Sequence, residues 1–231
     1  KEKVLEHIKS LSNECIAKES QRFFKMDKGE YGYGDVFLGI RVPDLRKLVT
    51  LYKNLPLNEI ESLLSSKYHE VRLFSIFLMV KLFQIDVSNQ KNIFKTYLNN
   101  IQYINNWDLV DSSAHYIVGK YLLNKDKKLL FDLSKSNNLW ERRISIISTF
   151  CYIKLNKYEE TINLSKVLIK DKEDLIQKSV GWMLREVGKR NKQLLIDFLK
   201  KYYQSMPRTM LRYSIEKFNN KERIKYLKSK I

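Results

Sequence analysis

The segment INNWDLVDSSAH, residues 104–115, places a tryptophan and two carboxylates together in a chain otherwise rich in lysine and arginine. On a helix, Trp107 and Asp111 are four residues apart and share a face, whereas Asp108 points away from it. Asp108 would then support the helix N-terminus, with Asn106 as the candidate cap. From position alone, Asp111 is either a catalytic carboxylate or an ordinary one paired with a neighbouring arginine.

Other side chains in and around this segment give weaker signals of chemistry. His115 follows Asp111 by four residues, but no third ligand stands at a spacing typical of a metal site. The two serines between them lack the nucleophile elbow and the matched base that acyl transfer requires. His7 and His69 suggest no function by their positions. We therefore expect neither a metal ion nor another cofactor.

A cation recurs near the start of four apolar helical segments. These are HEVRLFSIF with Arg72, WERRISIIS with Arg143, LIQKSVGWML with Lys178 and MLRYSIEKF with Arg212. The last three cations are 35 and 34 residues apart, and Arg72 precedes Arg143 by 71, about two such periods. One period after Arg72 falls on Trp107. This period is typical of stacked two-helix repeats, in which equivalent positions line one surface.

The repeat surface would therefore carry a cation in four repeats, and Trp107 with a carboxylate in one, which marks a candidate active site. Trp182 lies four residues after Lys178, on the same predicted helix face. Two tryptophans among cations fit aromatic contacts to a nucleotide. Taken singly, each tryptophan is more often a packing residue.

The elements that must position these residues are helices. Gly (7) and Pro (3) are scarce, and apolar residues recur at helical spacing almost throughout, so the sequence predicts an all-α protein. The glycine-rich segment at residues 28–39 predicts a loop or a small hairpin, followed by Pro43 at a helix start. Its glycines match neither a dinucleotide-binding nor a P-loop pattern. We expect the part of this loop around Tyr31 and Tyr33 to be mobile in the absence of a ligand, because its glycines are flexible and its backbone has few evident partners.

Composition indicates the kind of partner. The 231 residues carry 43 Lys and Arg against 26 Asp and Glu, a net charge of +17 that favours polyanions such as nucleic acid. The alternative is that part of this excess reflects codon drift in an AT-rich genome. Cys15 and Cys151 fit no metal spacing and indicate a reducing cytoplasm. No apolar run approaches the roughly 18 residues that span a bilayer.

Four segments, VFLGIRVPDLRKL, NNWDLVDSSA, LWERRISII and QKSVGWMLREVGK, together resemble the bacterial DNA alkylation repair glycosylases built from HEAT-like repeats, the AlkD family. The resemblance extends from about Phe23 to Phe218. It implies a superhelical solenoid whose basic concave face holds duplex DNA. It also implies hydrolytic removal of cationic alkylated purines, of the N3-methyladenine and N7-methylguanine type, without flipping the base.

The resemblance also assigns roles to residues. The catalytic aspartate of the family falls on Asp111, its two sugar-contacting tryptophans on Trp107 and Trp182, and its backbone-facing arginine on Arg143, with Arg142 adjacent. Because an N-alkylated purine already bears positive charge, it leaves without a general acid. A carboxylate beside the sugar then stabilises the cation that develops there. Arg72, Lys178 and Arg212 would extend the basic track along the DNA backbone.

Two departures from the family pattern leave an alternative open. The glycine-rich segment is an insertion relative to the simplest members, and Phe23 or Phe24 stands where an active-site tyrosine is expected. The alternative is a non-catalytic HEAT-repeat protein that binds damaged or branched DNA. A protein-binding scaffold fits the charge of +17 poorly. We expect one domain over residues 1–231, acting as a cytoplasmic monomer.

Overall fold

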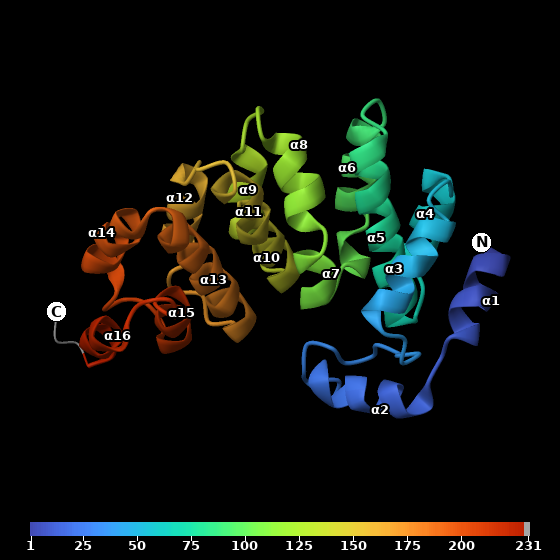
Figure 1. Ribbon diagram of the computed structural model, residues 1–231, viewed down its shortest axis with the longest axis horizontal. Coiled ribbons are helices and arrows are strands. Elements are labelled where there is room, and N and C mark those ends of the chain that lie inside the picture. Colours follow the sequence, from blue (N-terminus) through green and yellow to red (C-terminus); the bar gives the residue numbers. More distant parts are fainter. Residues whose placement is uncertain (229–231) are drawn as a thin grey trace. The chain divides into compact units, whose positions relative to one another are not determined.

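The computed structural model describes residues 1–228, and these residues form helices and turns with no strand among them (Figure 1). Val36 and Tyr68 make one isolated parallel bridge. This confirms the all-α prediction. The chain divides into two compact units, Lys1–Ser113 and Ala114–Ile231.

In the first unit, the central element is the helix α5, against which α3, α4, α6 and α7 all pack. Its sequence, HEVRLFSIFLMVKLFQI, is apolar on nearly every side, as expected of a helix surrounded by others. Polar residues at its start are therefore buried as well. The elements are α1 (Glu2–Ser10), α2 (Glu14–Phe23), α3 (Val42–Leu51), α4 (Leu57–Leu64), α5 (His69–Ile85), α6 (Gln90–Asn99), the 3-10 helix η1 (Ile101–Tyr103) and α7 (Trp107–Asp111).

Local sequence signals start these helices as predicted. Pro43 lies in the first turn of α3, where its missing N–H costs nothing. Asn106 has an extended backbone, and its side chain accepts a hydrogen bond from the Trp107 amide at 2.8 Å, so it caps α7. Both predictions are confirmed.

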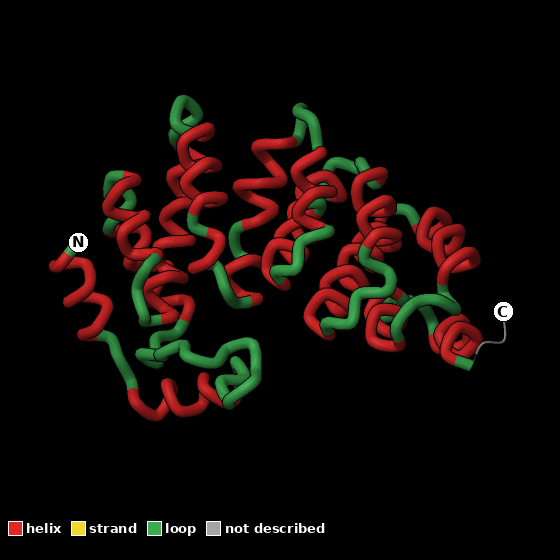
Figure 2. Tube along the Cα trace, turned by 180° about the vertical axis from the view of Figure 1, so that it is seen from behind, coloured by secondary structure: helices red, strands yellow, loops and turns green. Residues whose placement is uncertain are grey.

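The loop between α2 and α3 folds back over α2 (Figure 2) and is held by the start of α5. The Glu70 carboxylate accepts hydrogen bonds from three successive loop amides, those of Leu38, Gly39 and Ile40, at 2.9, 2.7 and 3.2 Å. Gly39 has φ +76°, and a Cβ at this position would lie 2.0 Å from the Asn13 carbonyl oxygen. Only glycine fits such a contact.

The same loop buries Asp35, Phe37 and Ile40. Its backbone amides at residues 38–40 are also bonded, so this half of the loop is well anchored. The preceding glycine turns are also hydrogen-bonded, for example from the Gly32 amide to the Lys25 carbonyl at 3.1 Å. These hydrogen bonds and buried side chains hold the loop against the first unit, and its mobility stays a prediction.

In the second unit, α10 packs between α9 and α13, and α13 packs on α14 and α15. Gly181 permits the close approach of α13 to α15, because a Cβ there would lie 2.5 Å from that of Tyr213. The elements are the π-helix η2 (His115–Gly119), α8 (Lys120–Leu122), α9 (Lys128–Ser134), α10 (Leu139–Ser148), α11 (Phe150–Ile153), α12 (Glu159–Val167), α13 (Asp174–Arg190), α14 (Lys192–Tyr202), α15 (Arg208–Ser214) and α16 (Asn220–Leu227).

The residues that define the repeat occupy equivalent places in their helices. Arg143, Lys178 and Arg212 are each the fifth residue of α10, α13 and α15, and Arg72 is the fourth residue of α5. Asp111 is the fifth residue of α7. The spacing therefore identified α7 as the helix that fills the vacant repeat, but Asp111, and not Trp107, stands at the position equivalent to the cations.

Candidate active site

The helix α7 carries Trp107 and Asp111. Trp107 and Asp111 open and close it and are both half-buried, while Leu109 and Val110 between them are buried and hold the helix against the core. Their four-residue spacing places them on one face. The Asp111 charge also acts on the interior: burial, and to a lesser degree this carboxylate, raises the pKa of Tyr97.

Aromatic rings from α2 and the loop surround Trp107. The Phe24 ring stacks on Trp107, with centroids 5.3 Å apart and planes at 14°, and Phe23 meets Trp107 edge-on at 5.7 Å. Phe24 stacks in turn on Phe37 at 4.8 Å. Phe23 is 65% exposed. Phe23 and Phe24, the two candidates for the position of the family tyrosine, thus both contact Trp107. Phe24 lies inside the unit, and Phe23 lies on its surface.

A buried chain of charged side chains, which we call the His69 network, adjoins this aromatic group, because the His69 ring contacts Phe24 and Phe37. It consists of Asp108, His69, Asp35 and Arg72. The His69 ring, 1% exposed, places Nε2 2.8 Å from Asp108 Oδ2 and Nδ1 3.1 Å from Asp35 Oδ2. Arg72 Nη2 donates to Asp35 Oδ1 at 2.6 Å. The network joins α5, the loop and α7.

The network corrects two expectations. Arg72 is 4% exposed and donates to Asp35 and to the Ser66 carbonyl, so it does not contribute to a surface track of cations. His69, to which its position in the sequence gave no role, lies at the centre of the network. The side chain of Asp108 turns inward, as expected, and its Oδ1 accepts from the Leu109 amide at 2.9 Å in the first turn of α7.

The pKa values of the network follow from its contacts. Burial disfavours the imidazolium, but the Asp108 carboxylate and the hydrogen bonds to Asp108 and Asp35 outweigh it and raise the pKa of His69 to about 9. Burial also disfavours ionised Asp35, yet the His69 hydrogen bond and the Arg72 guanidinium hold the pKa of Asp35 below its usual value. His69 and Asp35 are therefore both charged at neutral pH.

In the second unit, the predicted site residues are more deeply packed than expected. Trp182 is half-buried beside Phe150, with ring centroids 5.8 Å apart. Arg143 is 5% exposed, and its Nη1 donates to the Leu175 carbonyl. Arg142 Nε donates to Asp171 Oδ2 at 2.7 Å, and the same side chain also bonds to two backbone carbonyls. Arg142 therefore ties α10 to the segment that precedes α13.

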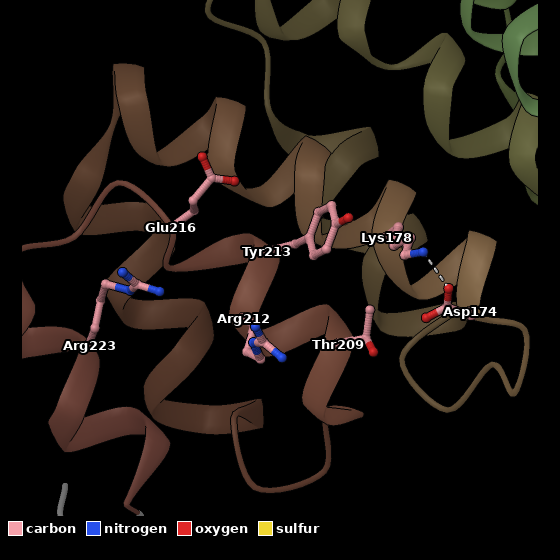
Figure 3. A pocket seen from close by; sticks show the side chains of 7 residues that line it. All are labelled: Asp174, Lys178, Thr209, Arg212, Tyr213, Glu216 and Arg223. Carbon is pink, nitrogen blue, oxygen red and sulfur yellow. Dashed lines mark ion pairs between the residues drawn. The ribbon is translucent and has the colours of Figure 1, made fainter. Parts of the chain in front are cut away.

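The remaining predicted cations, Lys178 and Arg212, line a pocket of about 360 Å³ (Figure 3). Lys178 Nζ lies 2.6 Å from Asp174 Oδ2, and Arg212 is exposed. The pocket lining, contributed by α13, α15 and residues that follow, comprises Asp174, Lys178, Thr209, Arg212, Tyr213, Glu216 and Arg223. Arg223 and the two hydroxyl groups were not anticipated, because their sequence positions fall outside the repeated pattern.

No helix within residues 1–228 is long and apolar enough to cross a membrane. No group of three or more His, Cys, Asp and Glu side chains in this range is arranged to hold a metal ion.

Solved structures share this fold. A predicted DNA alkylation repair enzyme from Enterococcus faecalis superimposes with a TM-score of 0.70 at 18% identity, over 90% of this chain and 97% of that one. AlkD2 from Streptococcus mutans gives 0.55 at 19%, over 90% and 99%. The smu.31 protein of Streptococcus mutans gives 0.54 at 22%, over 77% and 92%.

At these identities, the structural likeness shows a common helical-repeat fold. None of the curated proteins matches the chain. The family described as DNA alkylation repair enzyme matches residues 4–218, nearly the whole length. The chain therefore belongs to the DNA alkylation repair enzyme family.

Proposed function

We propose that this protein is a monofunctional DNA glycosylase that hydrolyses the N-glycosidic bond of cationic alkylated purines in duplex DNA without flipping the base. The substrates would be adducts of the N3-methyladenine and N7-methylguanine type. One observation carries the proposal: α7 presents Asp111 one helical turn from Trp107, in a helix fixed by a cap, buried residues and the His69 network.

The reaction needs a carboxylate but no general acid. An N-alkylated purine is already cationic, so it departs as a neutral base when the C1′–N bond breaks, and the positive charge moves to the deoxyribose ring. Asp111 would stabilise that charge, and water would then add its oxygen to C1′ and release a proton. A carboxylate fixed in advance at this position lowers the barrier because it need not reorient during the reaction.

The aromatic group supports the same assignment. The π face of a tryptophan attracts a cation, so Trp107 would favour the charged sugar as well as the charged base. Phe23 and Phe24 add apolar surface beside it and would reduce the access of bulk water. Trp182 remains a proposed sugar contact by resemblance to the family.

Binding to the DNA backbone would come mainly from the exposed cations of the second unit. The pocket lined by Lys178, Arg212 and Arg223 also offers the hydroxyls of Thr209 and Tyr213. A phosphodiester oxygen would replace Asp174 as the partner of Lys178. The other cations and the hydroxyls of the pocket would donate further hydrogen bonds to the same phosphate. Because these contacts are electrostatic, affinity should fall as salt rises.

A specific observation favours the alternative, a DNA-binding protein without glycosylase activity. Arg143, which the family resemblance assigns to a phosphate, is almost fully buried and bonds to a backbone carbonyl. The deciding measurement is release of N7-methylguanine from methylated duplex DNA by the purified protein. Release supports the glycosylase, whereas tight binding without release supports the alternative.

A further inference from the structure

The His69 network joins three elements that are far apart in the sequence. His69 belongs to α5, Asp35 to the glycine-rich loop and Asp108 to α7. Each bond of the imidazole therefore fixes one of the other two elements to the central helix of the unit. Neither Asp35 nor His69 belongs to the site residues proposed so far.

The geometry requires a protonated ring. Both ring nitrogens lie within hydrogen-bonding distance of a carboxylate oxygen, at 2.8 and 3.1 Å, and an ionised carboxylate can only accept. Each nitrogen must therefore carry a hydrogen. With Arg72 as the second cation, the network contains two positive and two negative charges and is neutral overall. A neutral imidazole would place a lone pair against a carboxylate and leave one buried negative charge uncompensated.

The helix that receives this bond is short. α7 has five residues, too few to be stable on its own, so its position depends on its anchors. Asp108 is an anchor at the first turn, because its two oxygens accept from His69 and from the Leu109 amide. Trp107 directly precedes Asp108, and Asp111 follows it by three residues. A shift of Asp108 would therefore move both proposed site residues.

A second connection runs through the aromatic rings. His69 stacks on Phe37, with centroids 4.5 Å apart and planes at 22°, and meets Phe24 at 5.0 Å. Phe24 stacks on Trp107. The imidazole thus holds Trp107 both through the backbone of α7 and through a continuous stack of rings.

We propose that His69, in its protonated form, is a positioning residue for base excision: it fixes α7 so that Trp107 and Asp111 face the substrate. Asp35 assists by keeping the ring between two carboxylates. The inference rests on the proposed function of Asp111. It also assigns a role to the glycine-rich loop, which supports the site through Asp35 and Phe37.

The charged groups that face the ring are those of the network itself. Asp35 and Asp108 favour the imidazolium, and Arg72 on α5 opposes it. Glu70, the neighbour of His69 on α5, directs its carboxylate to the loop amides of Leu38, Gly39 and Ile40. Deprotonation of His69 should therefore loosen α7 as the pH rises through about 9.

The test combines a kinetic and a spectroscopic measurement. Single-turnover release of N7-methylguanine is followed from pH 7 to 10 for the wild type and His69→Gln, with His7→Gln as the matched control. His7 lies in the same unit, but its Nδ1 is 3.0 Å from the Tyr52 hydroxyl and contacts no carboxylate in that bond. In parallel, 19F NMR follows Trp107 in protein labelled with 5-fluorotryptophan, its resonance assigned by Trp107→Phe.

We expect the wild-type rate constant to fall, and the Trp107 resonance to shift, with a common midpoint near pH 9. His69→Gln should lose roughly ten- to a hundredfold in rate constant at pH 7, keep its DNA affinity, and show neither pH-dependent change. His7→Gln should behave as the wild type. Asp35→Asn, which retains the bond between His69 and Asp108, should move both midpoints to lower pH.

A folded His69→Gln protein with the wild-type rate constant, pH profile and Trp107 resonance would overturn the inference. An unchanged midpoint in Asp35→Asn would also overturn the inference. This variant provides the test if His69→Gln fails to fold. If the wild type releases no base, the proposed function fails instead. The NMR titration then tests separately whether His69 fixes Trp107. A Trp107 resonance that does not change with pH would show that it does not.

Discussion

The His69 network and the pocket between α13 and α15 use charged residues in opposite ways. In the first unit, Arg72 is buried and satisfied by Asp35 and a carbonyl group. In the second, Arg212 stands at nearly the same helix position but is exposed beside Lys178. The two cations are equivalent in the repeat, yet one stabilises the interior and the other is available to a ligand. The position in the repeat therefore determines where on its helix a residue stands. The elements packed around that helix determine whether its side chain is buried or exposed.

The largest effect should come from Asp111. We predict that Asp111→Asn lowers the single-turnover rate of N7-methylguanine release at least about a hundredfold, because it removes a charge that acts on the transition state. DNA affinity and melting temperature should stay the same. Asp44→Asn, an exposed carboxylate in the first turn of α3, is the matched control. A parallel loss of stability, binding and rate in Asp111→Asn would instead indicate a structural carboxylate.

The comparison of the two cations predicts a large loss of stability for the buried one. Arg72→Ala leaves Asp35 and Asp108 with only one cation in the interior, so it should lower the free energy of unfolding by about 3–5 kcal/mol. Arg212→Ala, at an exposed position, should change it by less than about 0.5 kcal/mol. Urea denaturation of both variants measures the difference. Equal stabilities would contradict the burial of Arg72.

Stability should also depend on pH through His69. The folded protein holds this proton up to a pKa of about 9, whereas the unfolded chain releases it near the ordinary value of 6.5. The stabilising contribution is therefore complete below pH 6.5 and is lost as the pH rises to 9, by at most about 3 kcal/mol. Urea denaturation at intervals across this range measures it. His69→Gln should remove that slope, and His7→Gln should retain it.

The exposed cations should affect binding more than stability. If Arg212 neutralises one phosphate, Arg212→Ala should make the slope of log K against log salt shallower by about 0.9 and weaken binding to all sequences alike. Binding isotherms between 50 and 200 mM salt, roughly the range in which such slopes are measured, test this. A loss restricted to particular sequences would indicate base recognition.

Much of the fold followed from local signals. The apolar periodicity predicted the helices, Pro43 and Asn106 predicted two helix starts, and the recurring cations predicted which helix fills the vacant repeat, with an error of one helical turn at Trp107. These signals act over a few residues, so the sequence displays them directly. The position of α7 in the repeat, and hence the candidate site around Trp107 and Asp111, followed from the same periodicity.

The His69 network was missed because its bonds join residues 34 to 39 positions apart. No local pattern encodes such pairs. One signal was nevertheless available: His69, Glu70 and Arg72 begin a helix that is apolar on nearly every side. Charged residues on a helix that must be buried need partners of opposite charge, and the Asp35 of the glycine-rich segment was a candidate.

The bond pattern of Glu70 has a consequence for how the protein opens. One carboxylate accepts hydrogen bonds from three successive amides, so the amides of residues 38–40 should be protected from hydrogen exchange by the same opening free energy. Release of that carboxylate would free the loop together with α2, whose backbone Gly39 contacts. The N-terminal segment would then detach as a cooperative unit, and Glu70→Gln should accelerate exchange at all three amides together.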